Sequence, residues 1–126
     1  MKFNLPEGIT LASQMKVSRE HLASNTNGKL DVLSTIAVIK FMEDTCIELV
    51  DTKLPEGYET VSVEINVKHI APARENDTIF CNACLKYVDD RRLFFDVAVV
   101  DAEKNEIALG AQERYIVKLS EFLANF

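Results

Sequence analysis

The sequence has no long hydrophobic run and only three cysteines. No stretch approaches the roughly 20 apolar residues that a membrane-spanning helix needs, and the first ten residues lack the apolar segment of a signal peptide. Three cysteines are an odd number, which suits a reducing compartment better than a framework of disulfides. We therefore expect a cytoplasmic protein that does not associate with membranes.

Positive charge is also scarce. The formal net charge is −6 and the isoelectric point is near 4.9, which argues against a general surface for nucleic acid or anionic membranes. An anionic small molecule is still compatible with this chain, because a few Arg and Lys side chains can create a local positive site. Hydrophobic residues make up 48% and charged residues 27%, as in ordinary globular proteins, and residues 1–126 are expected to form a single domain.

A metal site is not expected. Cys81 and Cys84 form one CxxC pattern, but residues three apart on a strand point to opposite faces, and the surrounding segment has the composition of a strand. A second CxxC is missing, and the two histidines do not have zinc-finger spacing. The pattern favours buried structural cysteines, and no metal or resident cofactor.

The longest periodic segment predicts a helix over residues 34–51, with Asp31, Ser34 and Thr35 as candidate N-caps. This helix is apolar over most of its circumference, so we expect it to be covered on several sides. Strands are predicted over residues 10–19, 58–70, 78–88, 93–100 and 107–118, and a short helix over 120–124. An apolar helix followed by an antiparallel meander predicts an α+β fold in which the sheet wraps around the helix.

Glu43 is the most unusual residue of the predicted helix. At 100° per residue, the other charged side chains form one polar stripe: Lys40, Asp44, Glu48 and Asp51. Glu43 lies outside this stripe, among apolar neighbours, where a carboxylate loses hydration and needs a partner. Several interpretations remain open at this point: a carboxylate held for proton chemistry, or, more simply, an ion pair with Lys40 three residues earlier or a position at the edge of the helix.

His69 is predicted to face the same apolar core. It continues the alternating series Val61, Val63, Ile65 and Val67, whereas Ser62 and its alternate neighbours face the other way. Burying two titratable groups for packing alone is costly, so the convergence of Glu43 and His69 favours a functional site. Thr35 adds a hydroxyl at the helix start, where free backbone N–H groups favour anions, although a capping role also explains it.

Four segments together resemble the hotdog-fold thioesterases: STIAVIKFMED, VSVEINVKHIAP, DDRRLFF and GAQERYIV. The similarity is greatest to the fluoroacetyl-CoA thioesterase-like group and runs from about Leu33 to Phe122. It implies a hotdog fold, acyl-CoA hydrolysis, and a homodimer or higher homo-oligomer with the sites near the shared interface.

The resemblance also implies roles for individual residues. Thr35, Glu43 and His69 match the catalytic threonine, glutamate and histidine, and Arg114 matches an arginine near the acyl group. Ser62 stands where the family has a substrate-contacting glycine, which is a departure. The loop before Thr35 is shorter and lacks the phenylalanines of the fluoroacetyl enzyme, which argues against fluoroacetyl-CoA as the natural substrate.

The expected activity is hydrolysis of a small acyl-CoA, which is the substrate and not a cofactor. Glu43 would act as base or nucleophile, Thr35 would orient the reacting groups, and His69 would protonate the leaving sulfur. The CoA phosphates would meet cations around the meander, with these candidates: Arg74, Lys86, Arg91 and Arg92. Two alternatives remain: a hotdog dehydratase acting on a hydroxyacyl thioester, and a non-catalytic acyl-CoA-binding protein.

Overall fold

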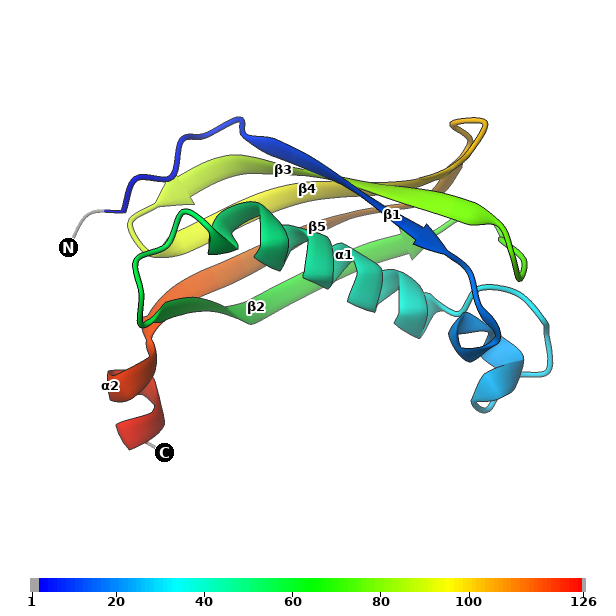
Figure 1. Cartoon of the computed structure of the whole chain (residues 1–126), viewed down its shortest axis with the longest axis horizontal. Helices are drawn as coiled ribbons and strands as arrows, with labels where there is room; N and C mark the ends of the chain where they lie inside the picture. Colours follow the sequence, from blue (N-terminus) through cyan, green and yellow to red (C-terminus); the bar gives the residue numbers. More distant parts are fainter. Residues whose placement is uncertain (1–2, 126) are drawn as a thin grey trace.

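A five-stranded antiparallel sheet curls around one long helix in the computed structural model, which describes residues 3–125 (Figure 1). The predicted α+β architecture is confirmed. Residues 1, 2 and 126, which the predicted domain includes, lie outside the described range. The strands are β1 (Thr10–Lys16), β2 (Tyr58–His69), β3 (Thr78–Asp89), β4 (Arg92–Asp101) and β5 (Glu106–Lys118), in the sheet order β1-β3-β4-β5-β2. The helices are α1 (Thr35–Asp51) and α2 (Leu119–Ala124), and two 3-10 turns are η1 (Arg19–His21) and η2 (Ala23–Asn25).

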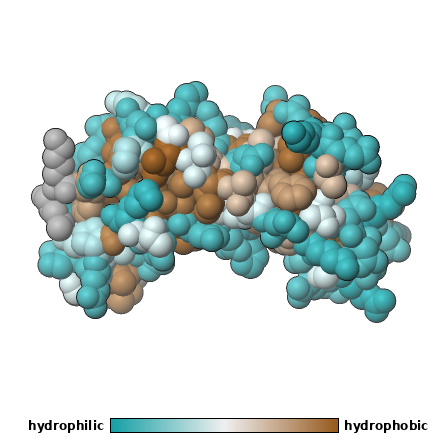
Figure 2. Space-filling model, turned by 45° about the horizontal axis from the view of Figure 1, so that its top comes forward, coloured by the Kyte–Doolittle hydropathy of each residue, from teal (hydrophilic) through white to brown (hydrophobic). Residues whose placement is uncertain are grey.

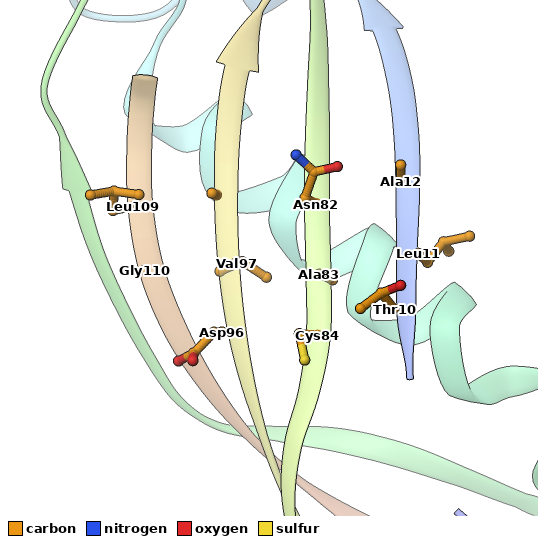
Figure 3. Close-up of a pocket in the computed structure, with 11 residues that line it drawn as sticks. Thr10, Leu11, Ala12, Asn82, Ala83, Cys84, Asp96, Val97, Leu109 and Gly110 are labelled. Atoms are coloured by element: carbon orange, nitrogen blue, oxygen red, sulfur yellow. The ribbon is translucent and has the colours of Figure 1, made fainter. Parts of the chain in front are cut away.

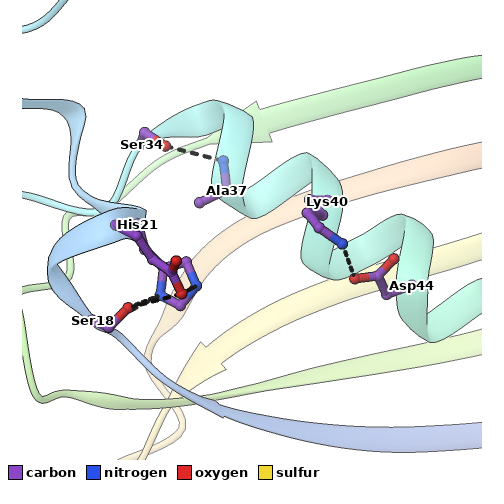
Figure 4. A network of polar contacts seen from close by, with 7 residues as sticks. Ser18, His21, Ser34, Ala37, Lys40 and Asp44 are labelled. Atoms are coloured by element: carbon purple, nitrogen blue, oxygen red, sulfur yellow. Dashed lines mark hydrogen bonds and ion pairs between the residues drawn. The ribbon is translucent and has the colours of Figure 1, made fainter. Parts of the chain in front are cut away.

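The first strand is shorter than predicted because the chain turns after Val17. The backbone N–H of Ser18 donates to Nδ1 of His21 at 3.0 Å, which closes the turn η1 (Figure 4). At the start of α1, the Ser34 hydroxyl accepts a hydrogen bond from the backbone N–H of Ala37 at 3.0 Å. Of the three candidate caps, Ser34 is therefore the N-cap, and the side chain of Thr35 is not used for capping.

The core lies between one face of α1 and the concave face of the sheet. The sheet contributes mainly side chains of the central strands β3 and β4. The helix contributes Val38, Phe41, Met42, Thr45, Cys46, Leu49 and Val50. One flank of α1 remains open, which differs from the coverage on several sides that its composition predicts. This flank is defined by Ile36, which is 69% exposed, and by the half-buried residues Ile39, Glu43 and Ile47.

The strand β2 lies at an edge of the sheet, beside β5. Its register with β5 shifts at Val63: Ser62 is opposite Arg114, and Glu64 is opposite Glu113. Val63 is thus an extra residue, a β-bulge, and an extra residue reverses the alternation of faces. Arg114 contacts Glu43 of α1, so Ser62, its cross-strand neighbour, lies on the helix side of the sheet.

The predicted alternation of β2 is therefore wrong before the bulge and right after it. Val61 is opposite Tyr115, which is 39% exposed, so Val61 faces away from α1. Ser62 takes the helix side in its place. Beyond the bulge, Ile65 and His69 keep the predicted side, and His69 contacts Thr35.

Gly110 in β5 lies so close to β2 that a side chain does not fit. A Cβ placed on Gly110 would overlap the carbonyl oxygen of Asn66 and lie 3.3 Å from Cγ2 of Val67. A backbone oxygen cannot rotate away, so the two strands would have to separate. We expect Gly110→Ala to lower the free energy of unfolding by about 1–3 kcal/mol in urea titrations. Ala111→Ser, at the exposed neighbouring position, is the control, and equal midpoints for the two variants would contradict the clash.

Within residues 3–125, none of the helices combines the length and apolar character that crossing a membrane requires.

Candidate active site

Thr35 and His69 form one polar pair at the start of α1. The strand β2 runs back along the helix, so its last residue, His69, returns to the first residue of α1. Oγ1 of Thr35 and Nδ1 of His69 share a hydrogen bond of 2.9 Å. The second ring nitrogen, Nε2, is buried and has no hydrogen-bond partner within residues 3–125. His69 is thus oriented by Thr35 and keeps one nitrogen free for another group.

Glu43 and Arg114 form a second polar group further along the helix. Nη1 of Arg114 lies 3.3 Å from Oε2 of Glu43, and the side chains are 4% and 33% exposed respectively. Arg114 also donates from Nε to Oγ1 of Thr60 at 2.9 Å and from Nη2 to the carbonyl oxygen of Thr60 at 3.1 Å. The guanidinium is therefore fixed by three hydrogen bonds, and it presents a positive charge to Glu43.

Lys40 is not the partner of Glu43. Its Nζ lies 2.7 Å from Oδ2 of Asp44, four residues along the helix, on the solvent-facing stripe (Figure 4). The interpretation of Glu43 as one half of an i,i+3 surface pair is therefore wrong. Its carboxylate is turned toward Arg114 in the sheet, on the open flank of α1.

The two groups are separate within one chain. Thr35 and Glu43 are eight residues apart, or about 12 Å along the helix axis. The structure brings together Thr35 with His69 and Glu43 with Arg114, and it records no contact between Glu43 and His69 among residues 3–125. The expectation that these two side chains meet is therefore not met inside a single chain.

Sequence reasoning missed two polar residues near Glu43. Thr60 anchors Arg114 through both of its oxygen atoms, although it looks like an ordinary strand residue. Gln112 is 3% exposed and neither its amide nitrogen nor its oxygen has a partner in the described part of the chain. Gln112 could have been identified from its position two residues before Arg114 on the same strand, because alternate residues of a strand share a face.

The cysteines do not provide a nucleophile in the core. Burial raises the pKa of the Cys46 thiol to about 12, and burial likewise raises the pKa of Cys81. Both therefore stay protonated at neutral pH. Cys81 is buried and Cys84 lines the opposite face of the sheet, as the alternation predicts, but Cys84 is only half-buried, so the expected burial is wrong for this residue. No group of three or more His, Cys, Asp or Glu side chains suited to a metal occurs within residues 3–125.

A hollow of about 400 Å³ lies on the sheet face away from α1 (Figure 3). Small or apolar side chains line most of it, among them Ala12, Ala98 and Leu109. None of the candidate site residues reaches this hollow. The polar groups that can do chemistry on a substrate lie on the helix side.

Comparisons with known proteins identify the family of this chain. Residues 17–120 match the family model described as fluoroacetyl-CoA-specific thioesterase. The fluoroacetyl-CoA thioesterase of Streptantibioticus cattleyicolor is 30% identical over 94 residues, which cover 75% of this chain and 67% of that protein.

Two solved structures are also similar. A hypothetical protein of Thermus thermophilus, a thioesterase superfamily member, superposes with a TM-score of 0.91 at 21% identity, covering 98% of this chain and 91% of the other. A hot-dog-like protein from Thermanaerovibrio acidaminovorans gives 0.87 at 27% identity, with coverage of 95% and 89%. The sheet wrapped around a helix is therefore a hotdog fold.

Proposed function

This chain belongs to the fluoroacetyl-CoA-specific thioesterase family and is an acyl-CoA thioesterase, and we propose that Glu43, with Thr35 and His69, hydrolyses a small acyl-CoA. One observation carries the proposal for Glu43: a carboxylate on an open, otherwise apolar flank of α1 is held by the buried guanidinium of Arg114. Such a carboxylate is oriented but still accessible, which suits an attacking group or a base.

In the base pathway, Glu43 takes a proton from water while the water oxygen attacks the thioester carbonyl. The carbonyl π electrons move to the oxygen, and they return as the C–S bond breaks. The departing thiolate of CoA takes a proton from His69, and the proton on Glu43 then returns to His69 through solvent, so the enzyme is restored and the products are a free acid and CoA. In the nucleophilic pathway, a Glu43 oxygen attacks the thioester carbonyl, the C–S bond breaks, and the CoA thiolate leaves with a proton from His69, which gives a mixed anhydride. Water then opens the anhydride, which releases the free acid and restores the Glu43 carboxylate. Thr35 orients His69 in both pathways.

A homodimer would unite the two polar groups. The edge strand β2 has unpaired backbone groups, and it exposes Val63 (55%) and Ile65 (36%) next to the open flank of α1. Antiparallel pairing of two β2 strands about an axis near Ile65 would place position 62 of one chain opposite the region of position 69 in the other. We infer that Glu43 and Arg114 of one protomer then face the partner's Thr35 and the partner's His69.

This arrangement predicts that Val63→Asp dissociates the dimer and abolishes most of the activity. A charge at the centre of the paired edge would be buried in the dimer without a partner, but exposed in the monomer. Sedimentation equilibrium and CoA release, measured on the same samples, test this. Tyr87→Asp, at a position that is 53% exposed and far along β3, is the matched control. A Val63→Asp protein that is monomeric and fully active would refute the shared site.

The reaction itself is tested by free thiol release from a panel of acyl-CoAs of increasing acyl size. Turnover that is greatest with small acyl groups supports the proposal. Hydration of an enoyl-CoA, followed by loss of its ultraviolet absorbance, would support a dehydratase instead. Tight acyl-CoA binding with no turnover of any member would support a binding protein. The cytoplasmic location stays a prediction.

A further inference from the structure

A charged hollow of about 480 Å³ lies at the end of the molecule that carries η1 and η2. Its lining is mainly polar: Arg19, Leu22, Ser24, Asn25, Asp31, Arg74 and Glu75. This end, on the right in Figures 1 and 2, is largely hydrophilic, whereas apolar side chains gather over the middle of the molecule. The hollow does not include any of the residues assigned to the reaction.

The two arginines of this hollow have unused hydrogen-bonding capacity. Neither the Arg19 nor the Arg74 guanidinium has an ion-pair or hydrogen-bond partner within residues 3–125. By contrast, Arg92 and Arg114 are both paired with carboxylates. Unpaired guanidinium groups that line a concave surface are suited to phosphate, which they bind through two parallel hydrogen bonds.

The carboxylates that line the same hollow do not form ion pairs with its two arginines. Asp31 accepts a hydrogen bond from the Ser24 hydroxyl, and Glu75 forms no ion pair among the described residues. Two positive and two negative side chains make the hollow neutral, while the whole chain carries −6. The hollow is therefore a local exception to the negative charge of the chain, and its carboxylates can accept hydrogen bonds from ribose hydroxyl groups.

A second hollow lies beside His69. It measures about 250 Å³ and has an apolar lining beside the histidine: Val32, Leu33, Ile70, Ala71 and Pro72. The two hollows are neighbours, because Leu22 of the first and Leu33 of the second form a β-bridge. The backbone N–H of Leu33 also donates to the carbonyl oxygen of Ala73 at 2.8 Å, next to Arg74.

The order of these surfaces matches the order of groups in an acyl-CoA: the reacting thioester, a long and mostly apolar pantetheine arm, and the phosphorylated adenosine. The five steps along the backbone from His69 to Arg74 span at most about 18 Å, which an extended pantetheine arm can bridge. We propose that the arginine hollow binds the phosphate groups of CoA, with Arg19 and Arg74 as the contacting residues. This inference rests on the proposed function, because it takes CoA thioesters as the substrate.

The test compares a full CoA thioester with the same acyl group on pantetheine, which lacks the phosphates. We expect the double variant Arg19→Gln/Arg74→Gln to raise KM for the acyl-CoA by about 10- to 100-fold, because two charge-assisted contacts are lost. Its kcat and its KM for the acyl-pantetheine should stay within twofold of the parent. The pair Arg91→Gln/Arg92→Gln, at the β3–β4 turn, is the control with the same change in charge.

Binding of CoA itself, measured by calorimetry on the parent and both double variants, separates the two proposals. A parent that binds CoA but does not cleave any thioester would refute the proposed function; weaker CoA binding by the Arg19/Arg74 variant alone would still support the phosphate site. Unchanged CoA binding and KM in that variant would overturn the site. An equal rise in KM for acyl-CoA and acyl-pantetheine would also overturn it, since the loss would then not involve phosphate. If only Arg91→Gln/Arg92→Gln loses affinity, the phosphates bind at the β3–β4 turn instead.

Discussion

Glu43→Gln is expected to lower kcat for acyl-CoA hydrolysis by about 10²- to 10⁴-fold, the usual contribution of a catalytic acid or base. Glutamine has nearly the same shape and can still accept a hydrogen bond from Arg114, so the site should keep its geometry. It cannot take a proton from water or attack the carbonyl. Steady-state thiol release measures the effect, and circular dichroism verifies that the variant is folded.

Asp44→Asn is the matched control for Glu43→Gln. Asp44 is the next residue of α1, and it pairs with Lys40 on the exposed stripe. Loss of this exposed pair should leave both the stability and kcat nearly unchanged. If Glu43→Gln hydrolysed acyl-CoA as fast as Asp44→Asn, Glu43 would be neither base nor nucleophile. A parallel fall in both variants would indicate a general disturbance of the helix.

Arg114→Met is expected to lower the free energy of unfolding by roughly 3 kcal/mol, at the lower end for breaking a buried ion pair because Glu43 is partly exposed. Methionine preserves much of the side-chain length but removes every donor. Both oxygen atoms of Thr60 and the carboxylate of Glu43 then lose a partner. Urea unfolding measures the stability, and thiol release should fall with it because Glu43 is no longer oriented.

Arg92→Met is the control for the loss of an arginine from the sheet. Arg92 pairs with Glu113 on the solvent-facing side of the sheet, so its removal should lower the stability far less than removal of Arg114. Equal stability of the Arg114 and Arg92 variants would mean that the buried pair contributes no more than a surface one. The double variant Arg114→Met/Glu43→Gln should recover part of the lost stability if the unpaired carboxylate causes it.

Much of the fold could be predicted from local patterns. The alternation in the four later strands and the apolar periodicity of α1 locate those elements to within two residues. The end of β1 was harder, because Ser18 and His21 close a turn through a side-chain contact that periodicity does not reveal. The helix sequence also could not predict how much of α1 is covered. That depends on where the sheet ends, and the composition of the helix does not contain this information.

For the candidate site, the sequence singles out individual residues, but it does not give the contacts that the structure shows between them. Glu43 and His69 are exceptional in their local patterns, and Thr35 stands at the helix start; the resemblance assigned Thr35 a catalytic role and added Arg114. The bulge at Val63 could not be predicted from the sequence. The apolar and polar residues of β2 still alternate along the chain, but the extra residue changes which of them face the helix. The ion pair between Glu43 and Arg114 joins residues 71 positions apart, so no helical spacing could have found it.

Thr60 holds Arg114 independently of Glu43, through both a hydroxyl and a carbonyl oxygen. If Glu43 is protonated or acylated during a turnover, as proposed, these contacts with Thr60 still hold the guanidinium of Arg114 in place. The positive charge of Arg114 would then stay in the same place through every turnover. The site would not need to reorganise for each new substrate, because its geometry is set when the chain folds.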